Sequence, residues 1–345
     1  MRAVVWQGTE TVVVEEVPAP AITDPHSAVV RVLASSICGS DLHLYHAKVP
    51  VVPGTILGHE AVGIVEAVGE RVERVRVGDR VLISAVVGCG LCQPCRALYP
   101  VGCETISVKV FGVSPLLPGT QAEKVVVPYA DFNVWPLPPE FSDLDALLLT
   151  DIFPTGLYAA DNARVSPGDV VAVIGCGPVG LCAIQCAHLL GAAMVVAVDQ
   201  VAERLRWATR FGAQAVANEG NVVRRVQEVT GEQGVDAVIE AVGSEETLRL
   251  ALDLVRAGGR ISMVGVLVRE DVHFPLGAAL LKDVTVRVGL VNVPRYLSQL
   301  FALVRNERLR PREMVTHTFS LSDAPRAYAL FDRKEDGCLK VCLRP

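Results

Sequence analysis

The stretch Val170-Val-Ala-Val-Ile-Gly175-Cys-Gly177-Pro-Val-Gly180 decides the fold of the second half of the chain. A short apolar run typical of a buried strand leads directly into three glycines with G-x-G-x-x-G spacing, and an apolar helix follows. The first glycine permits a tight turn, the second lets the backbone approach a pyrophosphate, and the third lets the helix pack against the strand. The phosphates would then lie at the helix N-terminus. The stretch therefore predicts a dinucleotide site on a parallel α/β sheet.

Strands and helices alternate on both sides of this stretch from about residue 144 onward. Such alternation, with continuously apolar strands, is typical of a doubly wound parallel sheet. The expected strands are 170–174, 194–198, 237–240 and 260–264, and the expected helices are 178–190, 202–211 and 245–255.

An acidic residue follows the second of these strands. Asp199 lies about 20 residues after Gly180, where a carboxylate accepts hydrogen bonds from both ribose hydroxyls of a dinucleotide. A 2′-phosphate beside Asp199 would be repelled, and Gln200-Val201 offers no compensating cation, although Arg204 could flank the ribose. The sequence therefore favours NAD over NADP.

The first 135 residues or so have a different pattern. Short apolar runs at 28–33, 61–68 and 80–84 are separated by turns rich in glycine and proline. This pattern predicts an all-β, barrel-like unit. After about residue 291 the pattern is less regular, and we expect the C-terminal tail to pack back on the first domain.

Composition narrows the class of protein. The chain has 345 residues, which predicts about two domains, and its 51% hydrophobic residues exclude disorder. The net charge of −6 argues against nucleic acid or an anionic membrane as a partner.

Residues 170–198 lack Asp, Glu, Lys and Arg, but their glycines favour a strand, a turn and a helix over a membrane span. No secretory signal is evident at the N-terminus, so we expect a cytoplasmic protein.

Four of the ten cysteines form a C-x2-C-x2-C-x7-C cluster. In a cytosolic chain such cysteines are expected to be free thiols or metal ligands rather than structural disulfides. Four thiolates this close can surround one ion tetrahedrally with no vacancy, as in a structural zinc site. An iron–sulfur site held by the same thiolates is the alternative. The cluster consists of Cys89, Cys92, Cys95 and Cys103.

A second set of candidate ligands is dispersed along the chain. Cys38, His59 and Asp151 offer a thiolate, an imidazole and a carboxylate. Catalytic zinc needs three protein ligands of these types and an open position. Each residue alone has an ordinary explanation as a small buried cysteine, a capping histidine or an acid at a helix entry. The spacing alone does not establish whether the three side chains meet at one site.

Together these motifs resemble the zinc-dependent medium-chain alcohol dehydrogenases. The resemblance rests on CGSD at 38–41, GHE at 58–60, the four-cysteine loop and GCGPVG at 175–180, in the family's order. The stretch TDIFPTG at 150–156 looks most like the branch containing bacterial formaldehyde dehydrogenases and related alcohol dehydrogenases.

The resemblance implies an α/β plus β fold in two domains. A GroES-like β-barrel catalytic domain would span 1–153 and be completed by 292–345. A Rossmann domain with a doubly wound parallel sheet would be inserted at 154–291.

The resemblance also implies an activity and residue roles. The family oxidises an alcohol reversibly to an aldehyde or ketone, with NAD(P) as the hydride acceptor. Cys38, His59 and Asp151 match the catalytic zinc ligands, although Glu60, the neighbouring acid that can swing onto the metal, is an equally capable oxygen ligand. Ser40 matches the hydroxyl that touches the substrate oxygen, and His43 the outer end of the proton relay. The expected cofactor-contact residues are Gly175, Gly177, Val179, Gly180, Asp199, Arg204, Val264, Val266, Leu290 and Val291.

These residues predict an NAD-dependent zinc alcohol dehydrogenase with two zinc ions per chain. We expect a homo-oligomer, a tetramer by resemblance or a dimer. A formaldehyde dehydrogenase or dismutase of the same branch is the nearest alternative, and a non-catalytic, redox-sensing NAD-binding zinc protein is the alternative from another class. The spacers between His43 and His59 and between Cys103 and Gln121 look short for the family. Because both lie near the expected substrate entrance, neither the alcohol nor the preferred direction is predicted.

Overall fold

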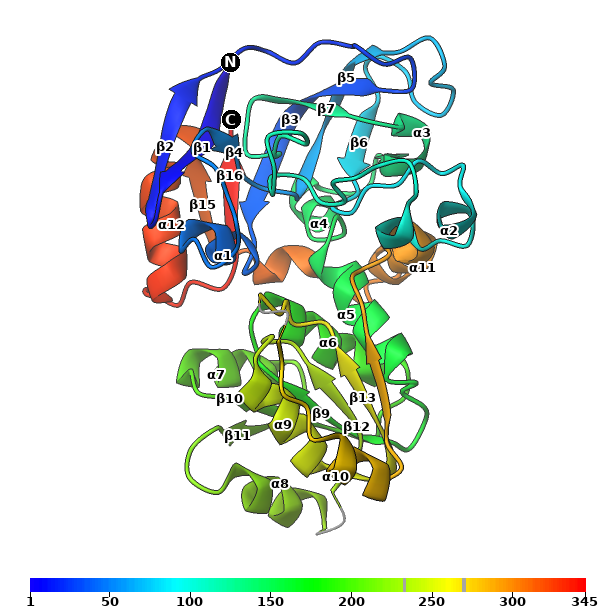
Figure 1. Ribbon diagram of the computed structural model, residues 1–345, viewed down its shortest axis with the longest axis vertical. Coiled ribbons are helices and arrows are strands. Elements are labelled where there is room, and N and C mark those ends of the chain that lie inside the picture. The colour runs from blue at the N-terminus through cyan, green and yellow to red at the C-terminus, as the bar shows by residue number, and fades with distance from the viewer. Residues whose placement is uncertain (232–233, 269–270) are drawn as a thin grey trace. The chain divides into compact units, whose positions relative to one another are not determined.

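The computed structural model describes residues 1–231, 234–268 and 271–345 (Figure 1). The chain divides into two compact units. The first consists of Met1–Pro154 together with Asn292–Pro345, and the second is the continuous segment Thr155–Val291. The helix α5 (Ile152–Asn162) carries the chain from the first unit into the second.

The first unit is built on two β-sheets. The larger has the order β15-β16-β3-β5-β6-β8, with β7 also pairing with β3, and the smaller has the order β2-β1-β4. The strands are β1 (Arg2–Gly8), β2 (Thr11–Glu16), β3 (Ala28–Ile37), β4 (Thr55–Ile56), β5 (Ala61–Val68), β6 (Arg80–Ile83), β7 (Lys124–Val127), β8 (Val134–Pro136), β15 (His317–Ser320) and β16 (Val341–Arg344).

Short helices connect these strands, and longer ones follow the return of the chain at Asn292. The helices are α1 (Asp41–Tyr45), α2 (Gln93–Arg96), η1 (Pro100–Gly102), α3 (Ala130–Asn133), α4 (Asp143–Leu147), α11 (Val293–Arg305), η2 (Pro311–Met314), η3 (Leu321–Asp323) and α12 (Ala324–Arg333).

The C-terminal strand completes the larger sheet. β16 runs antiparallel to β3, with Val341 opposite Ile37. Tyr328 and Phe331 of α12 pack in the same apolar cluster as Ile37 and Val341. The expectation that the tail packs on the first domain is therefore met by strand pairing and by burial of apolar side chains.

The second unit holds a six-stranded parallel sheet in the order β11-β10-β9-β12-β13-β14. Its strands are β9 (Val170–Ile174), β10 (Met194–Asp199), β11 (Gln214–Ala217), β12 (Val235–Glu240), β13 (Val255–Met263) and β14 (Thr285–Val288). Its helices are α6 (Pro178–Leu189), α7 (Ala202–Arg210), α8 (Val222–Thr230), α9 (Glu245–Leu254) and α10 (Leu276–Leu281). The predicted combination of a β unit and an inserted α/β unit is confirmed.

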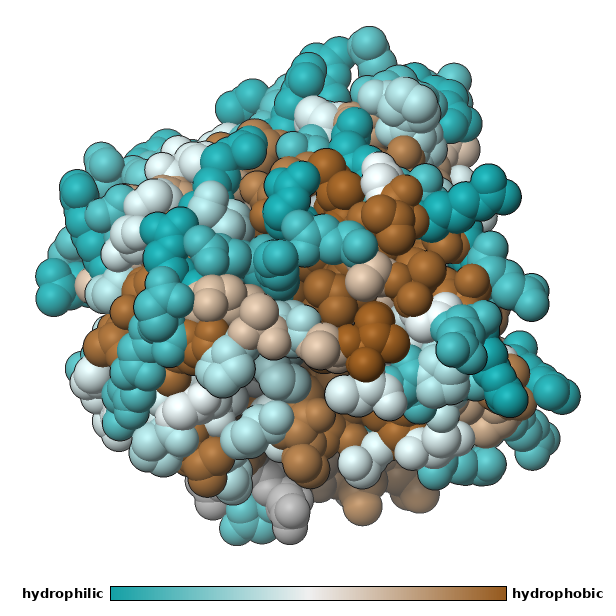
Figure 2. All heavy atoms as spheres, turned by 90° about the horizontal axis from the view of Figure 1, so that it is seen from above, coloured by the Kyte–Doolittle hydropathy of each residue, from teal (hydrophilic) through white to brown (hydrophobic). Residues whose placement is uncertain are grey.

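No helix among the described residues is long and apolar enough to cross a bilayer. The apolar stretch at 170–198 is divided among β9, α6 and β10. On the face of the molecule drawn in Figure 2, hydrophilic side chains surround patches of apolar ones. The high mean hydropathy, +0.39, therefore reflects exposed apolar patches as well as cores.

Candidate functional site

Strand register brings the dispersed ligands together. Cys38 directly follows β3, and the pair His59-Glu60 directly precedes β5. These two strands are antiparallel, with Ser35 opposite Ala61, so the end of one lies beside the start of the other. One ligand atom from each of Cys38, His59, Glu60 and Asp151 lies within 4.8 Å of the others.

The distances within this cluster fit a tetrahedral zinc ion. Asp151 Oδ2 lies 3.6 Å from Cys38 Sγ and 3.3 Å from His59 Nε2. Zinc bonds of about 2.3 Å to sulfur and about 2.0–2.1 Å to nitrogen and oxygen would separate such atom pairs by about 3.6 and 3.4 Å. All three residues are buried, which keeps competing water away from the donor atoms.

Glu60 differs from the other three because one of its oxygens is already bonded. Oε2 accepts hydrogen bonds from Ser36 Oγ and from the ammonium of Lys340, which also donates to Ile37 O at 3.0 Å. Burial raises the pKa of Glu60, and the nearby ammonium opposes that rise. Among the described residues, Oε1 has no hydrogen-bond partner. The residue can therefore offer one free oxygen to the cluster.

Asp41 stands behind His59 and was not singled out from the sequence. His59 Nδ1 lies 3.2 Å from Asp41 Oδ1, and Asp41 Oδ2 accepts the Cys38 amide at 2.9 Å. Burial lowers the pKa of His59, but Asp41 and the hydrogen bond to Asp151 outweigh it and hold that pKa well above its ordinary value. A carboxylate at the second ring nitrogen is a frequent partner of metal-bound histidine.

Of the two residues expected to move a proton, only Ser40 touches the cluster. Its Oγ lies 3.4 Å from His59 Nε2. His43 lies in α1 and is half-buried. Its backbone amide donates a hydrogen bond to the Ser40 carbonyl at 3.1 Å. Burial lowers the pKa of His43, and the positive charges of Lys48 and His46 lower it further.

The four-cysteine loop forms a second, separate cluster. The four Sγ atoms lie within 4.8 Å of one another, and Cys89 Sγ is 3.9 Å from Cys95 Sγ. Four zinc–sulfur bonds of about 2.3 Å would place the sulfurs about 3.8 Å apart. Burial raises the pKa of Cys89, but hydrogen bonds from Thr105 and from the Cys92 and Leu91 amides outweigh it and lower the pKa to about 6. The loop thus favours a thiolate at Cys89, whereas burial raises the pKa of Cys95 to about 12.

The glycine-rich turn of the second unit has the geometry that its spacing predicts. Gly175 has φ +88°, and a Cβ on Gly180 would lie 1.8 Å from Gly175 O. Asp199 Oδ2 accepts the Cys176 amide at 2.7 Å, and its Oδ1 accepts the Val201 amide at 2.8 Å. The carboxylate at the end of β10 is therefore fixed by the turn itself, with lone pairs left for a ribose.

The remaining expected cofactor residues vary in exposure. Arg204 lies beside Gly177, with its guanidinium carbon 3.9 Å from where a Cβ on that glycine would stand. Val179 is half-buried in α6. Val264 and Val291 are buried, whereas Val266 and Leu290 are 36% and 39% exposed.

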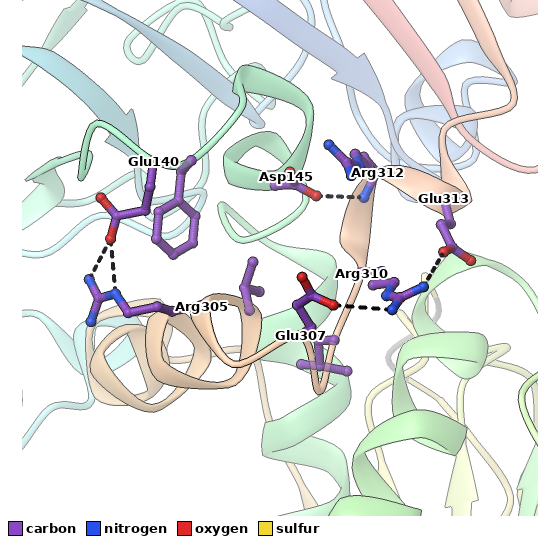
Figure 3. Close-up of a pocket in the computed structure, with 10 residues that line it drawn as sticks. Glu140, Asp145, Arg305, Glu307, Arg310, Arg312 and Glu313 are labelled. Atoms are coloured by element: carbon purple, nitrogen blue, oxygen red, sulfur yellow. Dashed lines mark hydrogen bonds and ion pairs between the residues drawn. The ribbon is translucent and has the colours of Figure 1, made fainter.

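The first unit has a pocket whose lining contains none of the candidate metal ligands (Figure 3). It has a volume of about 620 Å³ and lies between the C-terminal end of α11 and the segment around Glu140. Two ion pairs lie in its lining, since Arg305 contacts Glu140 at 2.8 Å and Arg310 contacts Glu307 at 3.3 Å.

Two family models match the chain. The alcohol dehydrogenase GroES-like domain matches residues 24–139, and the zinc-binding dehydrogenase model matches residues 178–306. A probable zinc-binding alcohol dehydrogenase of Mycobacterium tuberculosis is 41% identical, covering 100% of this chain and 89% of that protein. A glutathione-independent formaldehyde dehydrogenase of Pseudomonas aeruginosa is 32% identical, covering 96% of this chain and 94% of that protein.

Solved structures agree with these relatives. The alcohol dehydrogenase TADH of Thermus sp. ATN1 has 47% identity and a TM-score of 0.93, covering 100% of this chain and 99% of that one. A dehydrogenase of Escherichia coli CFT073 in complex with NADH and one of Sinorhizobium meliloti bound to NADP each have 28% identity, with TM-scores of 0.87 and 0.85. Each of these two covers 100% of this chain and 99% of its own.

Proposed function

The chain belongs to the zinc-dependent medium-chain alcohol dehydrogenase family, and from this premise we propose that it oxidises a small alcohol reversibly to an aldehyde or ketone, with NAD as the hydride acceptor. The observation that carries the proposal is the buried cluster of Cys38, His59, Glu60 and Asp151, whose donor atoms converge within 4.8 Å. Its donor types are those that zinc takes in catalytic sites.

We assign Cys38, His59 and Asp151 as the residues that hold catalytic zinc. The ion would supply a Lewis acid that lowers the pKa of the alcohol hydroxyl. One thiolate and one carboxylate balance its charge, so the substrate would be the only excess anion. Cys89, Cys92, Cys95 and Cys103 would hold a second zinc with a structural role.

Ser40 and His43 have separate roles in moving the proton. The Ser40 hydroxyl lies beside His59 Nε2, so it is placed to accept a hydrogen bond from an alcohol at the cluster. Serine is too weak a base to act alone, so we propose His43 as the residue that takes up the proton. The ribose hydroxyls of a bound cofactor would supply the connection between the two. The lowered pKa of His43 keeps its imidazole neutral and able to accept that proton near pH 7.

Glu60 is proposed as a transient rather than a permanent ligand. Ser36 and Lys340 already bond Oε2, which leaves only Oε1 to approach the cluster. Such an oxygen can help exchange water for substrate without closing the open position.

Asp199 supports NAD as the preferred cofactor. Its buried carboxylate would accept the ribose hydroxyls and repel a 2′-phosphate. Asp199→Ala should weaken NAD binding and improve NADP binding relative to NAD, measured as the ratio of kcat/KM values. A wild type that already prefers NADP tenfold or more would contradict this assignment.

We propose a homo-oligomer, a dimer or a tetramer, because one edge of the second unit is apolar and exposed. β14 is an edge strand whose four residues are all exposed. Leu276, Leu280 and Leu281 of the neighbouring α10 are 72%, 79% and 85% exposed. An edge strand with exposed apolar neighbours is a template for pairing with another chain. Sedimentation analysis of Leu281→Lys should show a lower mass than the wild type.

The test of the main proposal is a panel of primary, secondary and polyol alcohols with NAD, combined with metal analysis. Two zinc ions per chain together with NAD reduction support the proposal. One zinc and no turnover would favour the non-catalytic NAD-binding alternative.

The second candidate function is that of a formaldehyde dehydrogenase or dismutase. It is supported by the 32% identical relative from Pseudomonas aeruginosa. An enzyme of that kind would convert one aldehyde into both alcohol and acid without added cofactor, and a plain alcohol dehydrogenase would not.

A further inference from the structure

A line of buried polar side chains continues behind the candidate metal histidine. His59 Nδ1 lies 3.2 Å from Asp41 Oδ1, an ion-pair contact to an oxygen that has no hydrogen-bond partner among the described residues. The other Asp41 oxygen, Oδ2, accepts a hydrogen bond from the side-chain amide of Gln121 at 3.2 Å. The hydroxyl of Tyr328 donates to Gln121 Oε1 at 2.8 Å. The line thus runs from α12, near the end of the sequence, to the ring of His59.

The chemistry of its members allows only one orientation of the Gln121 amide. Gln121 Nε2 donates both to the Asp41 carboxylate and to Ser36 O, the latter at 3.0 Å. A carboxylate and a carbonyl only accept hydrogen bonds, so the NH2 group must face them. Oε1 then faces Tyr328, whose hydroxyl has to donate. A flipped amide would turn its one acceptor oxygen, Oε1, toward two other acceptors, Asp41 Oδ2 and Ser36 O.

Packing leaves Gln121 no room to move. Gln121 and Tyr328 are both 0% exposed. Gly58, the residue before His59, has φ +91°, and a Cβ there would lie 2.4 Å from Gln121 Cγ. The glycine of the GHE stretch therefore accommodates the Gln121 side chain as well as a left-handed backbone.

We propose that Gln121 and Tyr328 are positioning residues for His59. They hold the Asp41 carboxylate, and Asp41 keeps the proton of His59 on Nδ1, so that Nε2 is the free donor atom for the metal. This inference rests on the proposed zinc site. Losing an outer partner of a metal-bound histidine typically costs 10–100-fold in metal affinity or activity. In this chain the outer partners of His59 include two side chains beyond the Asp41 carboxylate, namely those of Gln121 and Tyr328.

Three variants isolate the hydrogen bonds from the packing. Gln121→Leu keeps a similar volume and removes every hydrogen bond of the amide, and Tyr328→Phe removes only one hydroxyl. Tyr45→Phe is the matched control, because Tyr45 is also buried and its ring lies 5.4 Å from that of Tyr328 in the same apolar cluster.

The readouts are the visible spectrum of the cobalt(II)-substituted protein and the rate at which the Cys38–His59–Asp151 site loses cobalt to a chelator. The rate should rise about 10-fold in Gln121→Leu and about 3-fold in Tyr328→Phe, with altered spectra. Tyr45→Phe should match the wild type in both.

The double variant Gln121→Leu/Tyr328→Phe decides between positioning and a general structural role. If Tyr328 acts only through Gln121, the double variant loses cobalt no faster than Gln121→Leu alone. Additive effects, or a Tyr328→Phe protein that behaves like Tyr45→Phe, would overturn the inference while leaving the proposed zinc chemistry intact. A wild type that binds no metal at Cys38, His59 and Asp151 would overturn both. If Gln121→Leu does not fold, the pair Tyr328→Phe and Tyr45→Phe still gives the answer.

Discussion

The two candidate metal clusters of the first unit are assembled in different ways. The four thiols come from one loop, Cys89 to Cys103, and their spacing alone places them around a point. Cys38, His59, Glu60 and Asp151 come from the end of β3, the start of β5 and the residue before α5. The first cluster is a property of local sequence, and the second is a property of strand register. Only the second depends on the whole unit being folded.

The clusters also differ in charge and in unused donors. Four thiolates would overbalance a Zn²⁺ ion and fill its coordination sphere, which suits a structural role. One thiolate and one carboxylate only balance the ion, and Glu60 Oε1 remains without a hydrogen-bond partner among the described residues. Substitutions in the two clusters should therefore have opposite consequences for catalysis and for stability.

The largest expected effect follows from Asp151→Asn. The change removes an anion from the cluster of Cys38, His59, Glu60 and Asp151, which we propose to be the catalytic cluster. We therefore expect loss of its zinc and a fall in kcat of at least about 100-fold. The four-cysteine zinc and the melting temperature should change little. Zinc per chain and kcat are the measurements. A protein with two zincs and near-normal rates would transfer the third-ligand role to Glu60.

Cys89→Ser should reverse this pattern. A structural zinc contributes folding free energy directly, so we expect a lower melting temperature and one zinc fewer, while folded protein keeps its turnover per active site. Cys186→Ala, in a buried position of α6 outside both clusters, is the control and should keep both zincs. If Cys89→Ser left both the melting temperature and the zinc content unchanged, the assignment of a structural zinc to the four cysteines would be contradicted.

Glu60→Gln tests the residue that links the catalytic cluster to the core. Both zincs should stay, and turnover should fall about 10-fold because ligand exchange loses its carboxylate. The amide also leaves the fully buried Lys340 without its counter-charge, which costs about 3–5 kcal/mol of stability. Glu60→Gln/Lys340→Met should recover much of that stability without recovering turnover. Recovery of both would show that Glu60 is purely structural.

The smallest expected effect is a pH dependence that arises from His43, which lies in α1 outside the cluster. Burial lowers the pKa of His43 below 6.5, so between that pKa and 6.5 the unfolded chain binds more protons than the folded one. Stability should therefore fall as the pH drops below about 6.5. The rate of alcohol oxidation should fall as the pH drops through the lowered pKa, where the imidazole becomes protonated. His43→Gln should lack that acid limb in kcat/KM, and His317→Gln should retain it.

The sequence could predict features that depend on local spacing, but not those that depend on contacts between distant residues. Periodicity and glycine spacing predicted the two kinds of sheet, and the predicted strand at 170–174 matches β9 at both ends. β13, however, starts at Val255 rather than at residue 260, because Gly258-Gly259 interrupts its apolar pattern. Asp41, Gln121 and Lys340 were missed as parts of the site. Gln121 bonds Asp41 and Lys340 bonds Glu60 across long stretches of chain, and such pairs leave no spacing for a sequence pattern to detect.

The pairing of Val341 with Ile37 has a consequence for how the protein is made. On the ribosome, β3 emerges before the whole second unit, whereas its partner β16 emerges only after it. The second unit is one continuous segment, so it can finish folding while the Ser35–Ile37 end of β3 still lacks its partner β16. During that interval β3 exposes apolar residues and open backbone groups, which is when a nascent chain is most prone to aggregate. We expect completion of the first unit, rather than folding of the second, to determine the yield of active protein.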